Sequence, residues 1–170
     1  MGSLMGSLAR KRIAIVTIEH DLHALAVKAA LAKHKDVDCF IIECNCLSGN
    51  SGLSWHRSRR FGCHAQLRVA AGLFLPVRDL DVIWWRRANS SQIIPDTLTH
   101  ADHIDVINND CRTGLLGVLL TEFHGIWISD PNATAVAENK LVQLRVANDA
   151  GLLVPETLVS QNPGHIIPLP

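Results

Sequence analysis

The chain has 170 residues, of which 48% are apolar, so it is long enough to bury one sizeable core and we expect one main domain. Its 16 basic and 16 acidic residues cancel, which argues against a general attraction to nucleic acid or to an anionic membrane, and we expect neither as a partner. The apolar run at residues 13–18 is too short for a signal-peptide core or a membrane span, so we expect a cytoplasmic protein.

The first part of the chain predicts an α/β domain over residues 12–129, after a disordered N-terminus at residues 1–11. The largely β-branched run at residues 13–18 is typical of a strand that is buried on both faces of a parallel sheet. A helix follows, with Asp21 as its N-cap and with apolar residues at helical spacing. Residues 37–43 predict a second strand, and the order of strand, helix and strand indicates a right-handed parallel unit.

The middle of the chain has less regular patterns. Residues 44–62 are rich in Ser, Gly, Asn and Arg, and they predict a loop with a short irregular strand near Trp55. Residues 66–74 predict an edge strand, and residues 80–86 predict a further strand. Residues 102–124 predict a long helix, and residues 126–128 predict a short strand. The predicted fold class is therefore α/β with a mainly parallel sheet.

The C-terminal part carries the clearest helix signals of the chain. Asp130 stands before a proline, which predicts the N-cap and the first position of a helix. Gly151 predicts the left-handed end of the same helix, and residues 157–159 read as a strand. We therefore expect a linker helix and a strand within residues 130–162, followed by a tail at residues 163–170.

The sequence predicts no metal site and no nucleophile. Cys44, Cys46, Cys63 and His64 include zinc-ligand types, but they lack the two short ligand pairs of structural zinc sites. The five cysteines fit reduced thiols in a reducing compartment. Residues 48–52 follow a strand but match neither the dinucleotide fingerprint nor the P-loop, so we expect a plain loop.

Three cationic residues are candidates for ligand binding. Arg86 and Arg87 stand at the carboxyl end of a predicted strand, where ligands of open α/β sheets gather, and guanidinium groups match carboxylates and phosphates. A solvated strand end explains the same two residues, and both readings stay open. Lys140 flanks the apolar face of the predicted linker helix, and physical reasoning alone places its side chain in water.

Two separated motifs resemble the ATP-grasp ligases. DVIWWRR at residues 81–87 looks most like the ATP-grasp maturases of ribosomally made peptides, of the microviridin or graspetide type. The run from Trp127 through Lys140 to VPETLVSQN resembles the junction between the N-terminal domain and the ATP-grasp core of these enzymes. Prokaryotic glutathione synthetases and ribosomal-protein glutamate ligases share its later part. The resemblance covers residues 81–162, which is about half of the chain.

The resemblance implies a fold, a reaction and roles for the cationic residues. The fold would be the pre-ATP-grasp domain, a three-layer, Rossmann-like α/β domain. In the family, ATP phosphorylates a carboxylate, an amine or hydroxyl then attacks it, and magnesium bridges the phosphates. The lysine at the position of Lys140 would contact the nucleotide phosphates. Arg86 and Arg87 match a family motif, but the resemblance assigns them no catalytic role, and they stay candidates for substrate binding.

The resemblance ends before the catalytic core of the family. Intact members continue with a second phosphate-binding lysine, a glycine-rich lid and magnesium ligands, whereas this sequence closes on GHIIPLP. We therefore expect an N-terminal fragment that is inactive alone and binds neither ATP nor magnesium tightly. Its expected partners are an ATP-grasp core and a precursor peptide, and a homo-oligomer is compatible with the sequence. A stand-alone module that binds a peptide or a carboxylate is the alternative.

Overall fold

The computed structural model describes residues 10–48, 52–60, 62–69, 72–94, 100–162 and 164. The predicted loop at residues 48–52 and the predicted N- and C-terminal tails lie mostly outside this part of the chain. The chain divides into two compact units, Met1–Asp130 and Pro131–Pro170. No helix in the described part of the chain combines the length and the apolarity that a membrane span requires.

The centre of the first unit is a sheet of four parallel strands in the order β2-β1-β6-β7. The strands are β1 (Lys11–Thr17), β2 (Val37–Glu43), β6 (Val82–Trp85) and β7 (Ile126–Ile128). In the register of this sheet, Ile15 of β1 lies between Ile41 and Trp84. The mainly parallel sheet and its four strands were predicted from the sequence and are confirmed.

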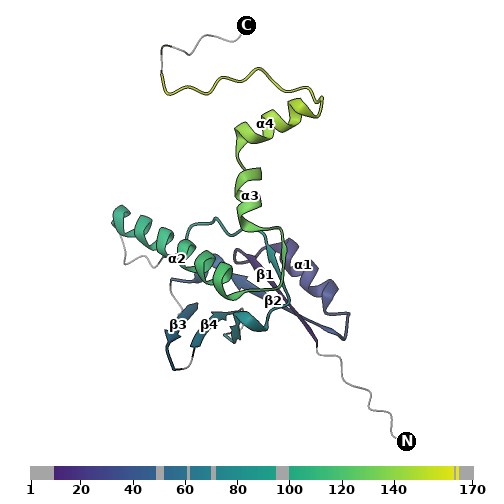
Figure 1. Ribbon diagram of the computed structural model, residues 1–170, viewed down its shortest axis with the longest axis vertical. Coiled ribbons are helices and arrows are strands. Elements are labelled where there is room, and N and C mark those ends of the chain that lie inside the picture. The colour runs from purple at the N-terminus through teal and green to yellow at the C-terminus, as the bar shows by residue number, and fades with distance from the viewer. Residues whose placement is uncertain are drawn as a thin grey trace, which may run out of the picture. The chain divides into compact units, whose positions relative to one another are not determined.

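Different layers cover the two faces of this sheet (Figure 1). Helix α1 (Leu22–Leu31) covers one face, where Ala24 packs with Ile15 and Ile41. Helix α2 (Ala101–Glu122) covers the other face, where Leu115 and Leu119 are fully buried. The chain crosses from β1 to β2 in one direction along the sheet and from β6 to β7 in the opposite direction. Right-handed connections in opposite directions place their helices on opposite faces, as observed for α1 and α2.

A second, antiparallel sheet packs into the same core as α2. Its strands are β3 (Leu53–Ser58), β4 (Gly62–Arg68) and β5 (Phe74–Pro76), and one-turn 3-10 helices at Cys44–Cys46 and Val77–Asp79 flank it. The strand expected near Trp55 is confirmed. The single strand expected at residues 66–74 is wrong, because the chain turns at Gly72, whose φ of 79° few other residues adopt, and Val69 N–H then donates to Leu73 O.

Gly125 sets the join between α2 and β7. A Cβ atom at this position would clash with Asp81 O, so only glycine allows the two backbones to approach so closely. The next residue, Ile126, donates its N–H to the same carbonyl at 2.9 Å. The sequence prediction that α2 ends near Gly125 is confirmed, and the glycine also brings β7 into register with β6.

The second unit contains α3 (Pro131–Ala137) and α4 (Lys140–Asp149), where the sequence analysis expected one continuous helix. The break arises at Asn139, whose side-chain oxygen accepts the N–H groups of Leu141 and Val142 and so starts a new helix. The predicted helix end is confirmed, since Gly151 has a φ of 75° and Leu152 N–H donates to Ala147 O. The strand expected at residues 157–159 is not formed.

Candidate functional site

Two predicted site residues lie at the carboxyl edge of the parallel sheet. After β1 the chain crosses to β2 on one side, and after β6 it crosses to β7 on the opposite side. The loops that follow β1 and β6 therefore diverge. Such a switch point is where ligands of open α/β sheets bind. Thr17 and Asp21 come from the β1 side of this point, and Arg86 and Arg87 come from the β6 side. The structure therefore brings both arginines to the edge that the sequence analysis named.

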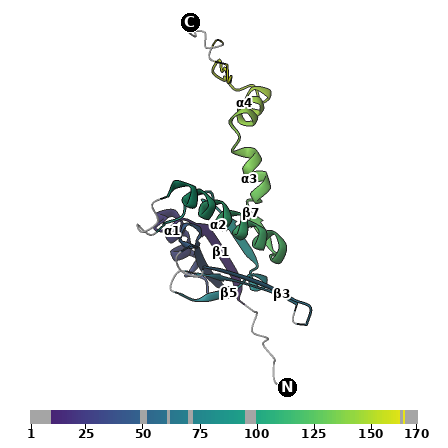
Figure 2. The same cartoon turned by 90° about the vertical axis from the view of Figure 1, so that its left-hand side faces the viewer.

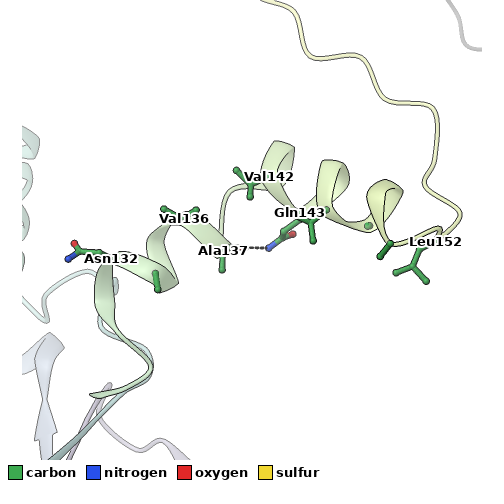
Figure 3. A pocket seen from close by; sticks show the side chains of 10 residues that line it. Asn132, Val136, Ala137, Val142, Gln143 and Leu152 are labelled. Carbon is green, nitrogen blue, oxygen red and sulfur yellow. Dashed lines mark hydrogen bonds between the residues drawn. The ribbon is translucent and has the colours of Figure 1, made fainter. Parts of the chain in front are cut away.

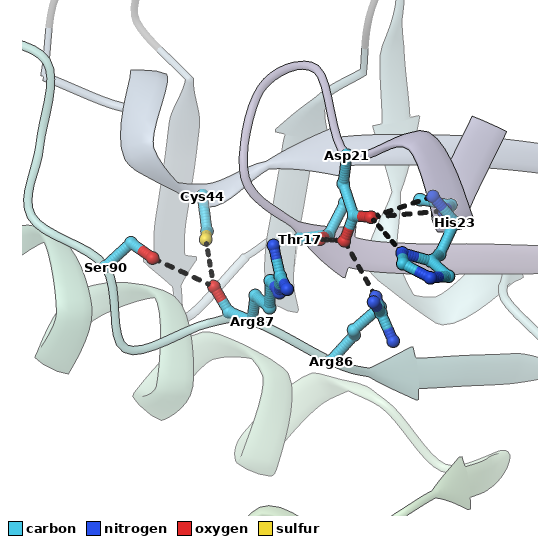
Figure 4. A network of polar contacts seen from close by, with 8 residues as sticks. Thr17, Asp21, His23, Cys44, Arg86, Arg87 and Ser90 are labelled. Atoms are coloured by element: carbon cyan, nitrogen blue, oxygen red, sulfur yellow. Dashed lines mark hydrogen bonds and ion pairs between the residues drawn. The ribbon is translucent and has the colours of Figure 1, made fainter.

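Asp21 is the centre of the polar contacts at this edge (Figure 4). Its side chain is only 1% exposed, and Oδ2 accepts from Thr17 Oγ1 at 2.6 Å and from Arg86 Nε at 2.7 Å. Its Oδ1 accepts the N–H groups of His23 and Ala24, which confirms the predicted N-cap of α1. The hydroxyl of Thr17 and these other donors outweigh burial and hold the pKa of Asp21 well below its usual range. Asp21 is therefore a fixed anion and not a general base.

The charge of Arg86 is matched within the protein. Its guanidinium is bound to Asp21, and its central carbon lies 5.2 Å from the centroid of the Trp84 ring, a cation–π arrangement. Its side chain is 22% exposed. Its backbone N–H donates to Val16 O at 3.0 Å, so the main chain is fixed as well. Arg86 holds the two diverging loops together.

Arg87 differs from its neighbour because its side chain is exposed. Its carbonyl oxygen accepts from Cys44 Sγ and from Ser90 Oγ, both at 3.4 Å. Within the described residues its guanidinium has no hydrogen bond or ion pair, although Figure 4 shows Arg86 and Arg87 extending from the end of β6 toward the loop that carries Asp21. The backbone of Arg87 is therefore positioned while its charge stays available to a ligand.

Cys44 supports the edge as a neutral donor. Its side chain is almost completely buried, and burial raises its pKa to about 12. A thiol with this pKa is not a nucleophile at neutral pH. Among the described residues, no group of three or more His, Cys, Asp or Glu side chains is placed to hold a metal ion.

Gln92 ties the neighbouring loops together, and the sequence analysis missed it. Its side-chain oxygen accepts the N–H groups of Leu47 and Ser48, and its amide nitrogen donates to Cys44 O at 2.7 Å. Its own N–H donates to Asn108 Oδ1 at 2.6 Å, which connects the loop to α2. No local pattern marks such a glutamine, because its partners are 16 to 48 residues away in the sequence.

Lys140, the third predicted site residue, is the first residue of α4 and belongs to the second unit. Its side chain is exposed, as physical reasoning from the sequence predicted. Nζ donates to Gln143 Oε1 at 3.0 Å, and Gln143 Nε2 donates to Ala137 O at 2.7 Å. Gln143 thus links the end of α3 to the start of α4, and it holds the lysine beside the positive end of a helix.

An open apolar groove of about 790 Å³ runs along the second unit (Figure 3). Small and branched side chains from both helices line it, chiefly those of Val136, Ala137, Val142, Val146 and Leu152. The break at Asn139 changes which residues share a face.

Comparison with solved structures identifies the fold. The chain is similar to macrocyclase MdnC of Microcystis aeruginosa MRC, solved with the precursor peptide MdnA, at 20% identity and a TM-score of 0.71. It is also similar to macrocyclase MdnB of the same organism, at 21% identity and a TM-score of 0.72. Each match covers 91% of this chain and 49% of the other chain.

A third similar structure is a RiPP-associated ATP-grasp ligase of Chryseobacterium gregarium, solved with ADP and with a leader and core peptide. The identity is 20%, the TM-score is 0.66, and the match covers 91% of this chain and 45% of the other. The chain thus spans about half the length of these proteins. No protein-family model and no curated protein matches the sequence. The similarity confirms the predicted fold, that of the N-terminal region of ATP-grasp ligases.

Proposed function

We propose that the chain forms the N-terminal domain of an ATP-grasp ligase that modifies a peptide. The observation that carries the proposal is a fold likeness over 91% of the chain to three enzymes, two of which were solved with peptides and one with ADP. In the proposed reaction, a peptide carboxylate attacks the terminal phosphate of ATP and releases ADP. An amine or hydroxyl then attacks the acyl phosphate, loses its proton and releases phosphate, which leaves an amide or ester.

Lys140 would be the contribution of this chain to nucleotide binding. Its amine is exposed at the first turn of α4, where the helix dipole also favours a phosphate. One cation does not make a complete site, and the described residues include no group that fits a magnesium ion. We therefore assign no metal ligand to this chain and expect the 170-residue chain alone to be inactive. Millimolar Mg-ATP should leave its melting temperature unchanged, because stabilisation follows the ratio of ligand concentration to Kd.

The test uses the protein at the length that its gene encodes, with Mg-ATP and short peptides encoded beside the gene. ADP formation together with the loss of one water for each new bond in the peptide would support the proposal. Lys140→Ala should lower ADP formation about tenfold or more, since one hydrogen bond to a charged group is lost, while Lys140→Arg should retain more activity. Absence of ADP formation with every such peptide would overturn it.

A second candidate function is a module that binds a peptide or free carboxylate at the sheet edge without ATP chemistry. Among the residues that the structure describes, the guanidinium of Arg87 has no partner, and its position beside the fixed Asp21–Arg86 pair favours this function. Titration with a carboxylate-bearing peptide should then shift the NMR signal of the Arg87 side chain, and Arg87→Gln should remove binding. No change in that signal would exclude this site.

A further inference from the structure

The charges of the chain are unevenly distributed. Residues 44–78 contain five of the 16 basic residues and none of the 16 acidic ones, although the chain as a whole is neutral. This segment includes the whole second sheet, and four of its arginines lie on or between β3 and β4, at Arg57, Arg59, Arg60 and Arg68. The β3–β4 hairpin is therefore a basic element on a neutral protein. Figure 2 shows it as a narrow ribbon that extends away from the parallel sheet.

The outer edge of β3 is free within the described residues, because β3 pairs only with β4. Arg68 N–H donates to Gly52 O, so Gly52 and Arg68 form a hydrogen-bonded pair. From this pair onward, hydrogen-bonded and non-hydrogen-bonded residue pairs alternate along the hairpin. Ser54 and His56 then direct their backbone groups toward β4. Leu53, Trp55 and Arg57 direct theirs to the free edge. These three residues can accept a further strand.

The side chains along this edge suit an acidic partner. Arg57 and Arg59 are exposed, and neither has an ion pair or hydrogen bond of its side chain within the described residues. Trp55 is 48% exposed, and its indole is held by a 3.2 Å hydrogen bond to Glu122. Glu122 is itself buried and paired with Arg78 at 2.7 Å, so its charge does not cancel those of the hairpin arginines. The edge thus offers fixed backbone groups, a half-exposed aromatic ring and unmatched positive charge.

We propose that the free edge of β3 docks an acidic peptide segment, which adds to the second sheet as an extended strand. Backbone pairing to Leu53, Trp55 and Arg57 supplies general affinity, as in other cases of strand addition. Carboxylates of the incoming strand meet Arg57 and Arg59 and supply selectivity. The free backbone edge favours a peptide over nucleic acid, because nucleic acid has no groups that complete a β-ladder. The inference concerns binding alone and adds a peptide contact to the proposed ligase role.

The test measures binding of a fluorescein-labelled peptide of alternating threonine and glutamate by fluorescence anisotropy, without nucleotide. The peptide with glutamine in place of glutamate is the matched probe. Arg57→Gln and Arg59→Gln should each weaken binding about threefold, as expected for an exposed ion pair. Arg57→Pro should weaken it about fivefold further, since it also removes an outward N–H, a change that an edge strand tolerates. Arg112→Gln, an exposed arginine on α2, should leave binding unchanged.

Three results would overturn the proposal. Equal binding of the glutamate and glutamine peptides would remove the charge recognition. Equal affinity of Arg57→Pro and Arg57→Gln would remove the strand addition. Tighter binding of a single-stranded RNA than of the acidic peptide would assign the basic hairpin to nucleic acid. None of these results affects the ligase role, because that role is measured by ADP formation.

Discussion

Replacing Asp21 with asparagine should destabilise the first unit through its contact with Arg86. The asparagine oxygen can still accept the N–H groups of His23 and Ala24, so the helix cap survives. Its amide nitrogen replaces the oxygen that accepts from Arg86 Nε at 2.7 Å and from the Thr17 hydroxyl at 2.6 Å. A hydrogen bond between charged groups contributes about 1.5–3 kcal/mol. Because Arg86 keeps some contact with water, we expect a loss of about 2 kcal/mol.

Urea unfolding, followed by far-UV circular dichroism, measures this loss as a lower midpoint with an unchanged slope. Arg86→Met and the double variant complete a double-mutant cycle, and we expect a coupling energy of at least about 1 kcal/mol. The reasoning would be refuted if Asp21→Asn lowered the free energy of unfolding by the same amount in the Arg86→Met background as in the natural sequence. The cost would then come from the cap or from Thr17, and not from the ion pair.

The pH dependence of the same pair gives an independent measurement. The pKa of Asp21 is lowered on folding from its ordinary value of 3.8, chiefly by the hydroxyl of Thr17 and then by Arg86. Stabilisation by a group with a lowered pKa is fully present above the unfolded value and is lost as the pH falls through the folded value. The difference in stability between the natural protein and Asp21→Asn should therefore be constant from about pH 5 to 8 and shrink below about pH 4. A difference that grew on acidification would contradict this assignment.

Three further predictions concern other parts of the chain. Gly125→Ala should lower the free energy of unfolding by about 2 kcal/mol or more, because its Cβ would meet Asp81 O. Gly117 has open space around it, so Gly117→Ala should stabilise α2 by up to about 1 kcal/mol. Urea unfolding compares the two variants. Cys44 should resist iodoacetamide in the folded protein at pH 8 and react after unfolding, as read by mass spectrometry of its peptide, because its pKa is raised to about 12. Asn139→Ala should destabilise α4 by about 1 kcal/mol, because the helix loses its N-cap, and NMR chemical shifts of the first turn of α4 should report the lower helicity. Unchanged chemical shifts would argue against the cap.

The sequence predicted those strands and helix ends that are determined by residues close together in the chain. Residues 13–18 predicted β1 because a strand buried on both faces has a continuous apolar pattern. Asp21 and Gly151 marked helix ends through side-chain capping and left-handed backbone, which act over a few residues. At Asn139 the cap signal was present, but apolar spacing on both sides resembled one helix. The capping bonds of Asn139 outweighed that periodicity.

The candidate site was predictable only in part, because its contacts join distant segments. The position of Arg86 and Arg87 followed from the rule for strand ends, and the structure places both there. The pairing of Arg86 with Asp21 spans 65 residues and depends on β6 lying beside β1, which no local pattern encodes. The pairing of β3 with β4 was not predicted from the sequence, since only one face of β4 is buried and most of β3 is exposed, which leaves a weak apolar pattern.

The Asp21–Arg86 ion pair and the arginines of the β3–β4 hairpin should respond differently to salt. Arg86 is held at 2.7 Å by a buried carboxylate, and such a pair is screened little by added salt. Arg57 and Arg59 are exposed and have no ion pair with any described residue, so their attraction to carboxylates should fall as the screening length shortens from about 8 Å at physiological ionic strength to about 3 Å at 1 M. If peptide binding weakens with salt and in Arg57→Gln, but not in Arg87→Gln, while the Asp21–Arg86 coupling stays constant, the peptide is held by the hairpin. Arg87 is exposed as well, so its attraction to a carboxylate is also screened by salt. Binding that is lost in Arg87→Gln but kept in Arg57→Gln would place the peptide at the sheet edge instead.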